Sequence, residues 1–480
     1  MARKEAISVR PSNWRQLQEE QTRLSPLDFV ITQHYNNYAL IFKLDEDLDK
    51  SVIVDIFVRG LEATLSQCRH IAGTVGKNSH GDFSIISTAD SAVPVVVQWC
   101  DGSESGFPCY SDIEKMHFVS GALGDPAKFT IPGMTMSSNA SPDIKPPVAG
   151  FQLTFIPGGM ILAVHIHHFA MDVTGTSALV HQLASHCYSI AHETEPPAWD
   201  KALVDRSRFI PPRPAKEALI DPPEPPQRHP DWLPCSWLLF DISPSKLGEL
   251  KRLATPTDGT WISTYDAVAA FLWRVVSKNR EPFYNPDLSA PALFGESVNM
   301  RSRVDPPVPA RYQGNLQCGG LSFLQKRQLT LAEVISGADL SDIAAYIRRI
   351  TNDVTQETLE ATIATAAKAR DASNLHFRQN SIPPMSLIVT DWRKVDMGDA
   401  DFGFGKPVAV RQFCDEVSEN LITIYPRRKA QGDDDSGLEV VVPFERHAVD
   451  KLLEDPQMNI FFTCRGFEAG TLLVKTEAGS

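Results

Sequence analysis

The feature that most constrains the fold is a proline-rich segment near the middle of the chain. Residues 196–230 carry ten of the 35 prolines found among 480 residues. Proline lacks a backbone N–H and fixes its own φ angle, so a segment this rich in it forms neither a long helix nor a central strand. We therefore predict a semi-rigid linker at 196–230 that joins two domains, residues 1–195 and residues 231–480.

Both halves alternate short apolar runs with helical patterns. Runs such as residues 160–168 and 438–444 have the length and the β-branched content of strands. A helix is predicted over residues 263–280, where Ser263 and Asp266 approximate a capping box and apolar residues recur at helical spacing. Another is predicted over residues 174–193. Strands mixed with long helices in two halves predict a mixed α/β (α+β) fold of two layered domains.

The charge and composition of the chain exclude several classes of partner. The formal net charge of −13 argues against nucleic acid or an anionic membrane surface. No run of 18 apolar residues is present to span a bilayer, and the first residues lack the apolar segment of a signal peptide. The eight cysteines show no CxxC spacing, which predicts reduced thiols. We therefore expect a cytoplasmic protein without a membrane partner.

A histidine-rich stretch ends one of the predicted strands. His165, His167 and His168 lie within four positions, and Asp172 follows four residues later. On a strand His165 and His167 face one side and His168 faces the other. Three interpretations are open: histidines satisfied by backbone groups, a zinc site on the His165–His167 pair, and a general base supported by Asp172. Because no third ligand follows at a suitable spacing, we predict no metal.

A second motif favours the catalytic interpretation. Residues 401–405 read Asp-Phe-Gly-Phe-Gly, a pattern typical of tight turning or close backbone packing. Together with His-His-Phe-Ala-Met-Asp at 167–172, it resembles the DFGWG and HxxxD boxes of the BAHD acyltransferases, in the same order and at a similar separation. Five further stretches resemble that family, so that the resemblance spans almost the whole chain: residues 24–29, 68–76, 261–274, 298–315 and 390–407.

The resemblance implies a two-domain fold similar to chloramphenicol acetyltransferase, each domain a mixed β-sheet backed by helices. It implies acyl-CoA as the co-substrate, with no permanently bound cofactor. The implied reaction is transfer of the acyl group to a hydroxyl group of a small-molecule acceptor by a monomeric enzyme. An amine acceptor, a carrier-protein-dependent condensation enzyme and a non-catalytic protein of the same fold are the alternatives.

The resemblance also assigns roles to the residues of the HxxxD box. His168 becomes the general base that deprotonates the acceptor for direct attack on the thioester, with no acyl-enzyme intermediate. Asp172 becomes a structural carboxylate. Its expected partner is Arg301, in preference to Arg303. Removing one member of such a buried pair leaves a stranded charge.

The remaining assignments concern the second half of the chain. Trp392 and Thr390 match a Thr-x-Trp segment that lies at the active site in plant members, and the Trp392 N–H is the expected oxyanion donor. A structural role is implied for Asp401, Gly403 and Gly405. For coenzyme A we expect contacts from Ser263 through the N-terminal N–H groups of its helix, and from Arg303 and Lys406.

Two positions depart from the family pattern. Val173 follows Asp172 where the family has glycine, and the glycine comes at Gly175 instead, which predicts a different loop geometry. Phe404 replaces the tryptophan of the second box, a loss of volume that a structural role tolerates.

Overall fold

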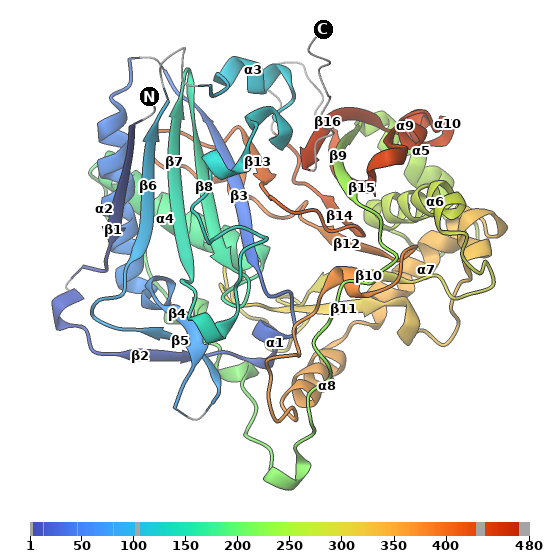
Figure 1. Cartoon of the computed structure of the whole chain (residues 1–480), viewed down its shortest axis with the longest axis horizontal. Coiled ribbons are helices and arrows are strands. Elements are labelled where there is room, and N and C mark those ends of the chain that lie inside the picture. Colours follow the sequence, from blue (N-terminus) through green and yellow to red (C-terminus); the bar gives the residue numbers. More distant parts are fainter. Residues whose placement is uncertain are drawn as a thin grey trace, which may run out of the picture.

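The computed structural model describes residues 3–12, 14–45, 47–79, 81–100, 106–428 and 437–469. Two large sheets stand side by side, each covered by helices, and a small third sheet lies below the first (Figure 1). Most strands of the first sheet come from the first half of the chain, and all strands of the second sheet come from the second half.

The first sheet has six strands, and its centre is fully buried. Every residue of β7 and β8 is buried, which explains why their sequences are nearly continuous apolar runs. In sheet order the strands are β1 (Arg3–Val9), β6 (Val93–Trp99), β7 (Ala149–Ile156), β8 (Gly159–His167), β3 (Tyr35–Lys43) and β13 (Ala409–Gln412). The small sheet contains β2 (Glu20–Arg23), β5 (Phe83–Ser87) and β4 (Thr74–Lys77).

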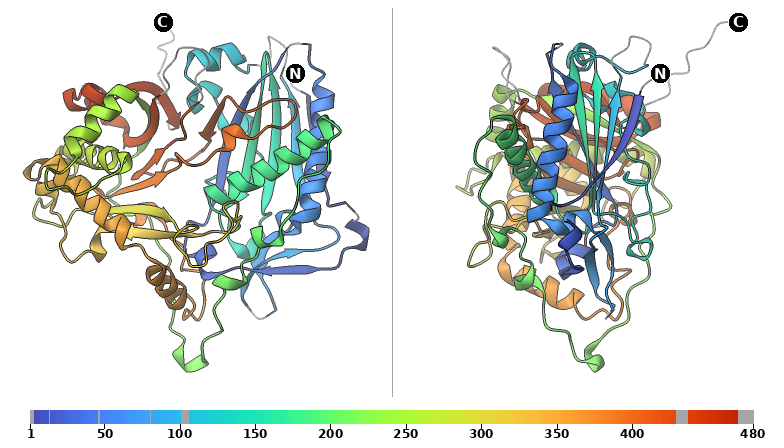
Figure 2. Two further views of the ribbon diagram at one scale, coloured as in Figure 1. Left: turned by 180° about the vertical axis from the view of Figure 1, so that it is seen from behind. Right: turned by 90° about the vertical axis from the view of Figure 1, so that its left-hand side faces the viewer.

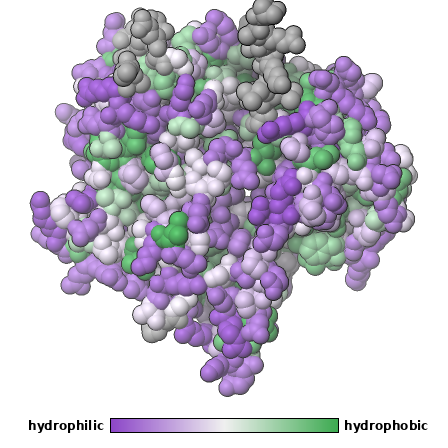
Figure 3. Space-filling model, viewed as in Figure 1, coloured by the Kyte–Doolittle hydropathy of each residue, from purple (hydrophilic) through white to green (hydrophobic). Residues whose placement is uncertain are grey.

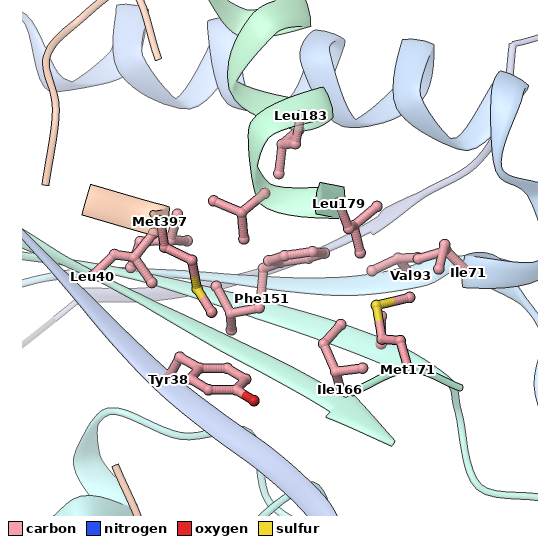
Figure 4. Packing of buried hydrophobic residues seen from close by; sticks show 14 of the residues in the cluster. Tyr38, Leu40, Ile71, Val93, Phe151, Ile166, Met171, Leu179, Leu183 and Met397 are labelled. Carbon is pink, nitrogen blue, oxygen red and sulfur yellow. The ribbon is translucent and has the colours of Figure 1, made fainter. Parts of the chain in front are cut away.

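Two long helices, α2 (Lys50–Gln67) and α4 (Val173–Ala191), cover one face of the first sheet (Figure 2). Leu179 and Leu183 of α4 point toward Phe151 of the sheet, and Met397 from the second half enters the same cluster (Figure 4). The predicted helix at 174–193 is therefore confirmed, because its apolar stripe fills this core. Two short helices complete the first half: α1 (Pro26–Phe29) and α3 (Tyr110–Lys115).

The second sheet has seven strands and its own core. In sheet order they are β11 (Gln317–Leu321), β10 (Phe294–Asn299), β12 (Leu387–Asp391), β14 (Leu421–Ile424), β15 (Leu438–Glu445), β9 (Cys235–Ile242) and β16 (Thr463–Ala469). Six helices accompany it: α5 (Pro244–Ala254), α6 (Thr264–Tyr284), α7 (Leu340–Asp353), α8 (Gln356–Ala366), α9 (Val449–Leu453) and α10 (Pro456–Phe461). The predicted helix at 263–280 corresponds to α6, with the capping box of Ser263 and Asp266 fully formed.

The proline-rich segment crosses the surface without an α-helix or a sheet strand. It contains three short turns, at Lys201–Leu203, Ser207–Phe209 and Lys216–Ala218, and its middle projects from the molecule (Figure 1). That projecting part is largely hydrophilic (Figure 3). The division into 1–195, 196–230 and 231–480 remains a prediction, and its ends, residues 1–2 and 470–480, lie outside the described residues.

One strand crosses between the halves. β13 (Ala409–Gln412) pairs antiparallel with β3 and forms an edge of the first sheet, although it belongs to the second half of the sequence. The mixed α/β class is confirmed, but this exchange has no signal in the sequence. All eight cysteines are free thiols, as predicted. Within the described residues, every helix is too short or too polar to cross a bilayer.

Candidate active site

His168 lies one residue beyond the end of β8, where the chain turns toward α4. Its backbone N–H donates to the His34 carbonyl at 2.9 Å, which ties the strand end to β3. His168 is partly exposed, whereas His165 and His167 are completely buried. The alternation predicted for the strand therefore separates one accessible imidazole from two inaccessible ones.

His165 and His167 serve the structure around this strand end. His165 Nδ1 lies 2.5 Å from Asn37 Nδ2, and its Nε2 accepts from a backbone N–H at 3.4 Å. His167 Nε2 bonds the Ala140 carbonyl at 2.8 Å, and its Nδ1 accepts from the Phe169 N–H at 3.1 Å. Burial lowers the pKa of each to about 4. All four ring nitrogens are engaged, and the described residues contain no group of three potential metal ligands.

The environment of His168 keeps its imidazole neutral. Burial lowers the pKa of His168, while nearby backbone groups, the charge of Asp172 and the side chain of Asn315 oppose the shift. The Nδ1 atom is buried and has no hydrogen bond of normal geometry. The His34 ring lies 5.4 Å from the His168 ring, centre to centre, and burial followed by the proximity of His168 lowers the pKa of His34 to about 3.

Asp172 is fixed by Arg301, as the resemblance implied. Arg301 donates two bonds to the carboxylate, from Nη2 to Oδ1 at 2.9 Å and from Nη1 to Oδ2 at 3.0 Å. The backbone N–H groups of Gly175 and Leu316 add bonds at 2.8 and 2.9 Å. Burial acts to raise the pKa of Asp172, but Arg301 and the two N–H groups outweigh it, so the pKa lies below its usual value. Arg303 instead donates to the Thr351 carbonyl in the last turn of α7 at 2.8 Å and to the Val354 carbonyl just after it at 2.7 Å.

The position of the glycine after Asp172 has a local explanation. Asp172 is the N-cap of α4, so Val173 is the first helical residue and Gly175 supplies the capped N–H. A Cβ atom on Gly175 would lie 2.5 Å from the Gln313 carbonyl oxygen. The glycine is therefore needed where α4 meets the segment after Arg301.

Three residues that no sequence pattern singled out, Arg206, Asp28 and Asn315, stabilise the turn after His168 through hydrogen bonds and an ion pair. Arg206, from the proline-rich segment, donates to the Ala170 carbonyl at 2.5 Å and pairs with Asp28 at 2.8 Å. Asn315 Nδ2 bonds both Asp28 Oδ1 and the His168 carbonyl at 3.0 Å. Arg206 and Asp28 are almost completely buried. The Ser25–Asp28 capping box is a signal that could have revealed Asp28, but a lone arginine among prolines carries none.

Trp392 and Thr390 lie together at the end of β12. The Trp392 indole N–H donates to Thr390 Oγ1 at 3.0 Å. The Trp392 ring is 7% exposed and packs between Tyr38 and Tyr425, with ring centres 5.7 and 5.9 Å away. The indole N–H expected to serve an oxyanion is therefore engaged with Thr390 here.

The DFGFG segment packs against α4, away from His168. Asp401 Oδ1 accepts the Gly403 N–H at 3.0 Å, and Lys406 lies 3.9 Å from the carboxylate. Gly403 has a φ of +84°, and a Cβ there would lie 2.6 Å from the Ala191 Cβ. Phe404 contacts the Phe42 ring at 5.7 Å between centres. Gly405 also has a positive φ, of +140°.

The residues expected to contact coenzyme A are spread over the second half. Ser263 caps α6, and its hydroxyl is bonded by Arg348 at 2.7 Å. Arg303 faces backbone carbonyls, and burial lowers its pKa. Lys406 keeps an exposed side chain, with 52% of its surface accessible. The structure thus joins Asp172 and Arg301 beside His168, while Ser263, Arg303 and Lys406 each bond to a different partner.

Comparison with known proteins agrees with this architecture. The Transferase family matches residues 3–458. An acetyltransferase of Gibberella zeae is 39% identical over 475 residues, which cover 98% of this chain and 95% of that protein. The trichothecene 3-O-acetyltransferase of Fusarium sporotrichioides is 27% identical, covering 82% of this chain and 87% of its own.

Solved structures show the fold. The Fusarium sporotrichioides enzyme bound to coenzyme A and T-2 superimposes with a TM-score of 0.75 at 23% identity, over 93% of this chain and all of that one. Vinorine synthase gives a TM-score of 0.66 at 18% identity, over 97% of this chain. Fold and family match together identify the chain as a two-domain acyltransferase of the chloramphenicol acetyltransferase type, a class that uses acyl-CoA as co-substrate. The chain belongs to the Transferase family, that of the BAHD acyltransferases.

Proposed function

We propose that this enzyme transfers an acyl group from acyl-CoA to a hydroxyl group of a small-molecule acceptor, with His168 as the general base. The observation that carries the proposal is a partly exposed imidazole with a lowered pKa at the end of β8, on a turn that residues from both halves hold in place. A neutral imidazole is the form that accepts a proton near neutral pH.

The reaction follows from this position. Since Nδ1 is buried, Nε2 is the nitrogen available to a reactant. It takes the proton of the acceptor hydroxyl while the oxygen attacks the thioester carbonyl carbon. The tetrahedral intermediate then collapses, the C–S bond breaks, and the imidazolium returns the proton to the coenzyme A thiolate. No bond forms between the protein and the acyl group.

Asp172 supports the base indirectly in this proposal. Its carboxylate already accepts four bonds, two from Arg301 and two from backbone N–H groups. Its role is therefore to fix the turn and the start of α4, and to add a negative charge that raises the His168 pKa against burial.

We assign stabilisation of the oxyanion, the negatively charged oxygen of the tetrahedral intermediate, to the Trp392–Thr390 pair. Because Thr390 Oγ1 accepts the indole N–H, the proton of the Thr390 hydroxyl is the one that the pair can direct at a reactant. A positioned donor of this kind is worth about 10²–10³ in rate. For the phosphates of coenzyme A the proposal keeps Ser263 with the N-terminus of α6, Arg303 and the exposed Lys406.

A thiol-release assay tests the proposal. A panel of acyl-CoA donors, from acetyl to hydroxycinnamoyl, is offered with pooled alcohols, phenols and amines, and products are identified by mass spectrometry. Acceptor-dependent release of coenzyme A that disappears in His168→Ala and persists in His192→Ala, an exposed histidine, supports it. Amide products alone would replace the hydroxyl acceptor by an amine, and full activity of His168→Ala would exclude the mechanism.

We also propose that the enzyme is a monomer in the cytoplasm. His168, Asp172 and Arg301 come from one chain, so the site needs no second copy. We therefore expect a monomer in size-exclusion chromatography with light scattering, and a cytoplasmic location in fractionated cells.

A further inference from the structure

His34 is the neighbour of the proposed base on the adjacent strand. β3 and β8 pair antiparallel with Tyr35 opposite His167. One step beyond this pair, the backbone N–H of His168 donates to the His34 carbonyl at 2.9 Å, so these two residues lie opposite each other. Their ring centres are 5.4 Å apart, and the ring planes are tilted by 32°. Opposite residues of an antiparallel pair project from the same face of the sheet, so the two imidazoles lie side by side.

This face of the first sheet also carries the contact with Trp392 of the proposed oxyanion pair. Side chains alternate along a strand, so Asn36 and Tyr38 follow His34 on the same face. The centre of the Tyr38 ring lies 5.7 Å from that of Trp392, and Tyr38 packs in the core that α4 covers (Figure 4). His34, His168 and Trp392 therefore belong to one side of the sheet.

The hydrogen bonds of the His34 side chain use only one of its two ring nitrogens. Nε2 lies 3.1 Å from Asn36 Oδ1 and 3.2 Å from Thr32 Oγ1. An amide oxygen can only accept, so Nε2 carries the proton of the ring and Nδ1 carries the lone pair. Nδ1 forms no hydrogen bond to any described residue, and it keeps access to solvent on a partly exposed side chain. His34 therefore presents an acceptor nitrogen that the fold leaves free.

His34 is suited to accept a hydrogen bond but not to take a proton. Burial, followed by the nearby His168, lowers the pKa of His34 to about 3. An imidazole with such a pKa stays neutral at neutral pH and is too weak a base to compete with His168. A group that only accepts a hydrogen bond serves recognition, because a reactant without the matching donor leaves it unpaired.

The separation of the two rings limits which reactant can use both of them. Each hydrogen bond between a hydroxyl group and a ring nitrogen spans about 2.6–3.2 Å. Two hydroxyl groups on neighbouring or next-but-one carbon atoms of one molecule can therefore reach both rings, whose centres are 5.4 Å apart. Hydroxyl groups at opposite ends of a six-membered carbon ring point away from each other, so only one of them can approach this pair.

We propose that His34 selects acceptors with two nearby hydroxyl groups, one of which donates to His34 Nδ1 while the other is deprotonated by His168. The inference rests on the proposed acyl transfer and narrows the acceptor to a 1,2- or 1,3-diol. His34 holds the hydroxyl group that does not react, and it thereby orients the other one toward the His168 ring. Each binding event yields a monoester, because the hydroxyl group on His34 keeps its proton.

Binding is measured first, by ligand-observed NMR titration with free coenzyme A present, so that no acyl group is available for transfer. The probes are trans-1,2-, cis-1,3- and trans-1,4-cyclohexanediol, which share one formula and differ in the spacing of their hydroxyl groups. The wild-type protein is expected to bind the 1,2- or the 1,3-isomer about 3- to 10-fold more tightly than the 1,4-isomer, which corresponds to one hydrogen bond.

Two amide variants separate the roles of the two His34 nitrogens. His34→Gln keeps an N–H for Asn36 near the position of Nε2 but has no acceptor at the position of Nδ1, so it should lose the preference. His34→Asn has an amide oxygen near the position of Nδ1 and should retain the preference. A merely structural role of the bond to Asn36 predicts the opposite order. His192→Gln, on an exposed histidine, is the matched control and should bind all three isomers as the wild type does.

Equal affinity for the three isomers, no binding of any of them, or an unchanged preference in His34→Gln would overturn the inference. A thiol-release assay with the same isomers separates it from the proposed function. A binding preference that depends on His34, without acyl transfer to any acceptor, would sink the function and keep the assignment of His34. Ester formation at equal rates on all three isomers, unaffected by His34→Gln, would do the reverse.

Discussion

Replacing Arg301 by leucine should destabilise the protein through Asp172. Arg301 supplies two of the four bonds to a carboxylate that is 3% exposed, and it carries the cation that compensates for burial. Removing one member of a buried ion pair costs roughly 3–5 kcal/mol. At about 2 °C per kcal/mol for a large domain, the midpoint of thermal unfolding should fall by about 6–10 °C.

The pH dependence of this loss identifies its cause. In the wild type the folded-state pKa of Asp172 is lowered, so its stabilising contribution is present above the unfolded value of about 3.9 and is lost as the pH falls through the lower folded value. In Arg301→Leu burial prevails and raises that pKa. The difference in stability between variant and wild type should then be largest at neutral pH and shrink as the pH is lowered through the raised value.

The assay is thermal unfolding of both proteins, followed by circular dichroism across the neutral to mildly acidic range. A control is the double variant Arg301→Leu with Asp172→Asn, which removes the stranded charge and should be more stable than Arg301→Leu alone. A loss that stays constant with pH, or a double variant no better than the single one, would refute the ion-pair account.

Four further outcomes are expected. His168→Ala should lower kcat by a factor of about 10²–10⁴ and leave the unfolding temperature unchanged. In the wild type, burial lowers the His168 pKa, so kcat should fall only when the pH drops below the ordinary histidine value of about 6.5. Arg206→Met should cost roughly 3–5 kcal/mol of stability together with activity, whereas Arg213→Met, on a half-exposed side chain of the same segment, should cost less than about 1 kcal/mol in the same unfolding assay. Thr390→Val should lower kcat by about 10²–10³ while its effect on KM stays small; an unchanged kcat would remove the pair from the chemistry. Gly403→Ala should lower the unfolding temperature by the equivalent of about 1–3 kcal/mol and leave kcat of the folded enzyme unchanged, as measured by paired unfolding and turnover assays.

Local patterns of the sequence predicted much of the fold. The apolar stripe of α4 and the capping box of α6 are visible in the sequence because they depend on residues a few positions apart. The β13 strand could not be found in this way. Its four residues form a strand only because they pair with β3, which lies more than 350 positions earlier in the chain.

The candidate site, like the fold, was predictable from the sequence only where its residues form short motifs. The boxes around His168 and Asp401 were recognised as motifs, and the Asp172–Arg301 pair came from the resemblance. The Arg206–Asp28–Asn315 connection is built from three distant segments, so that no spacing in the sequence predicts it. The engagement of the Trp392 N–H by Thr390 is also a matter of rotamers rather than of sequence.

The β13 strand has a consequence for how the protein is made. During synthesis one edge of β3 stays unpaired until residues 409–412 have left the ribosome. The turn after His168 also lacks its bonds to Arg301 and Asn315 until those residues have been made. An unpaired edge is a site for association with other chains. A fragment that stops at the proline-rich segment therefore contains the proposed base His168 but lacks Arg301, Asn315 and the β13 strand that closes the sheet edge. We therefore expect the two halves to fold as one unit, because the edge of β3 stays open to other chains for most of translation.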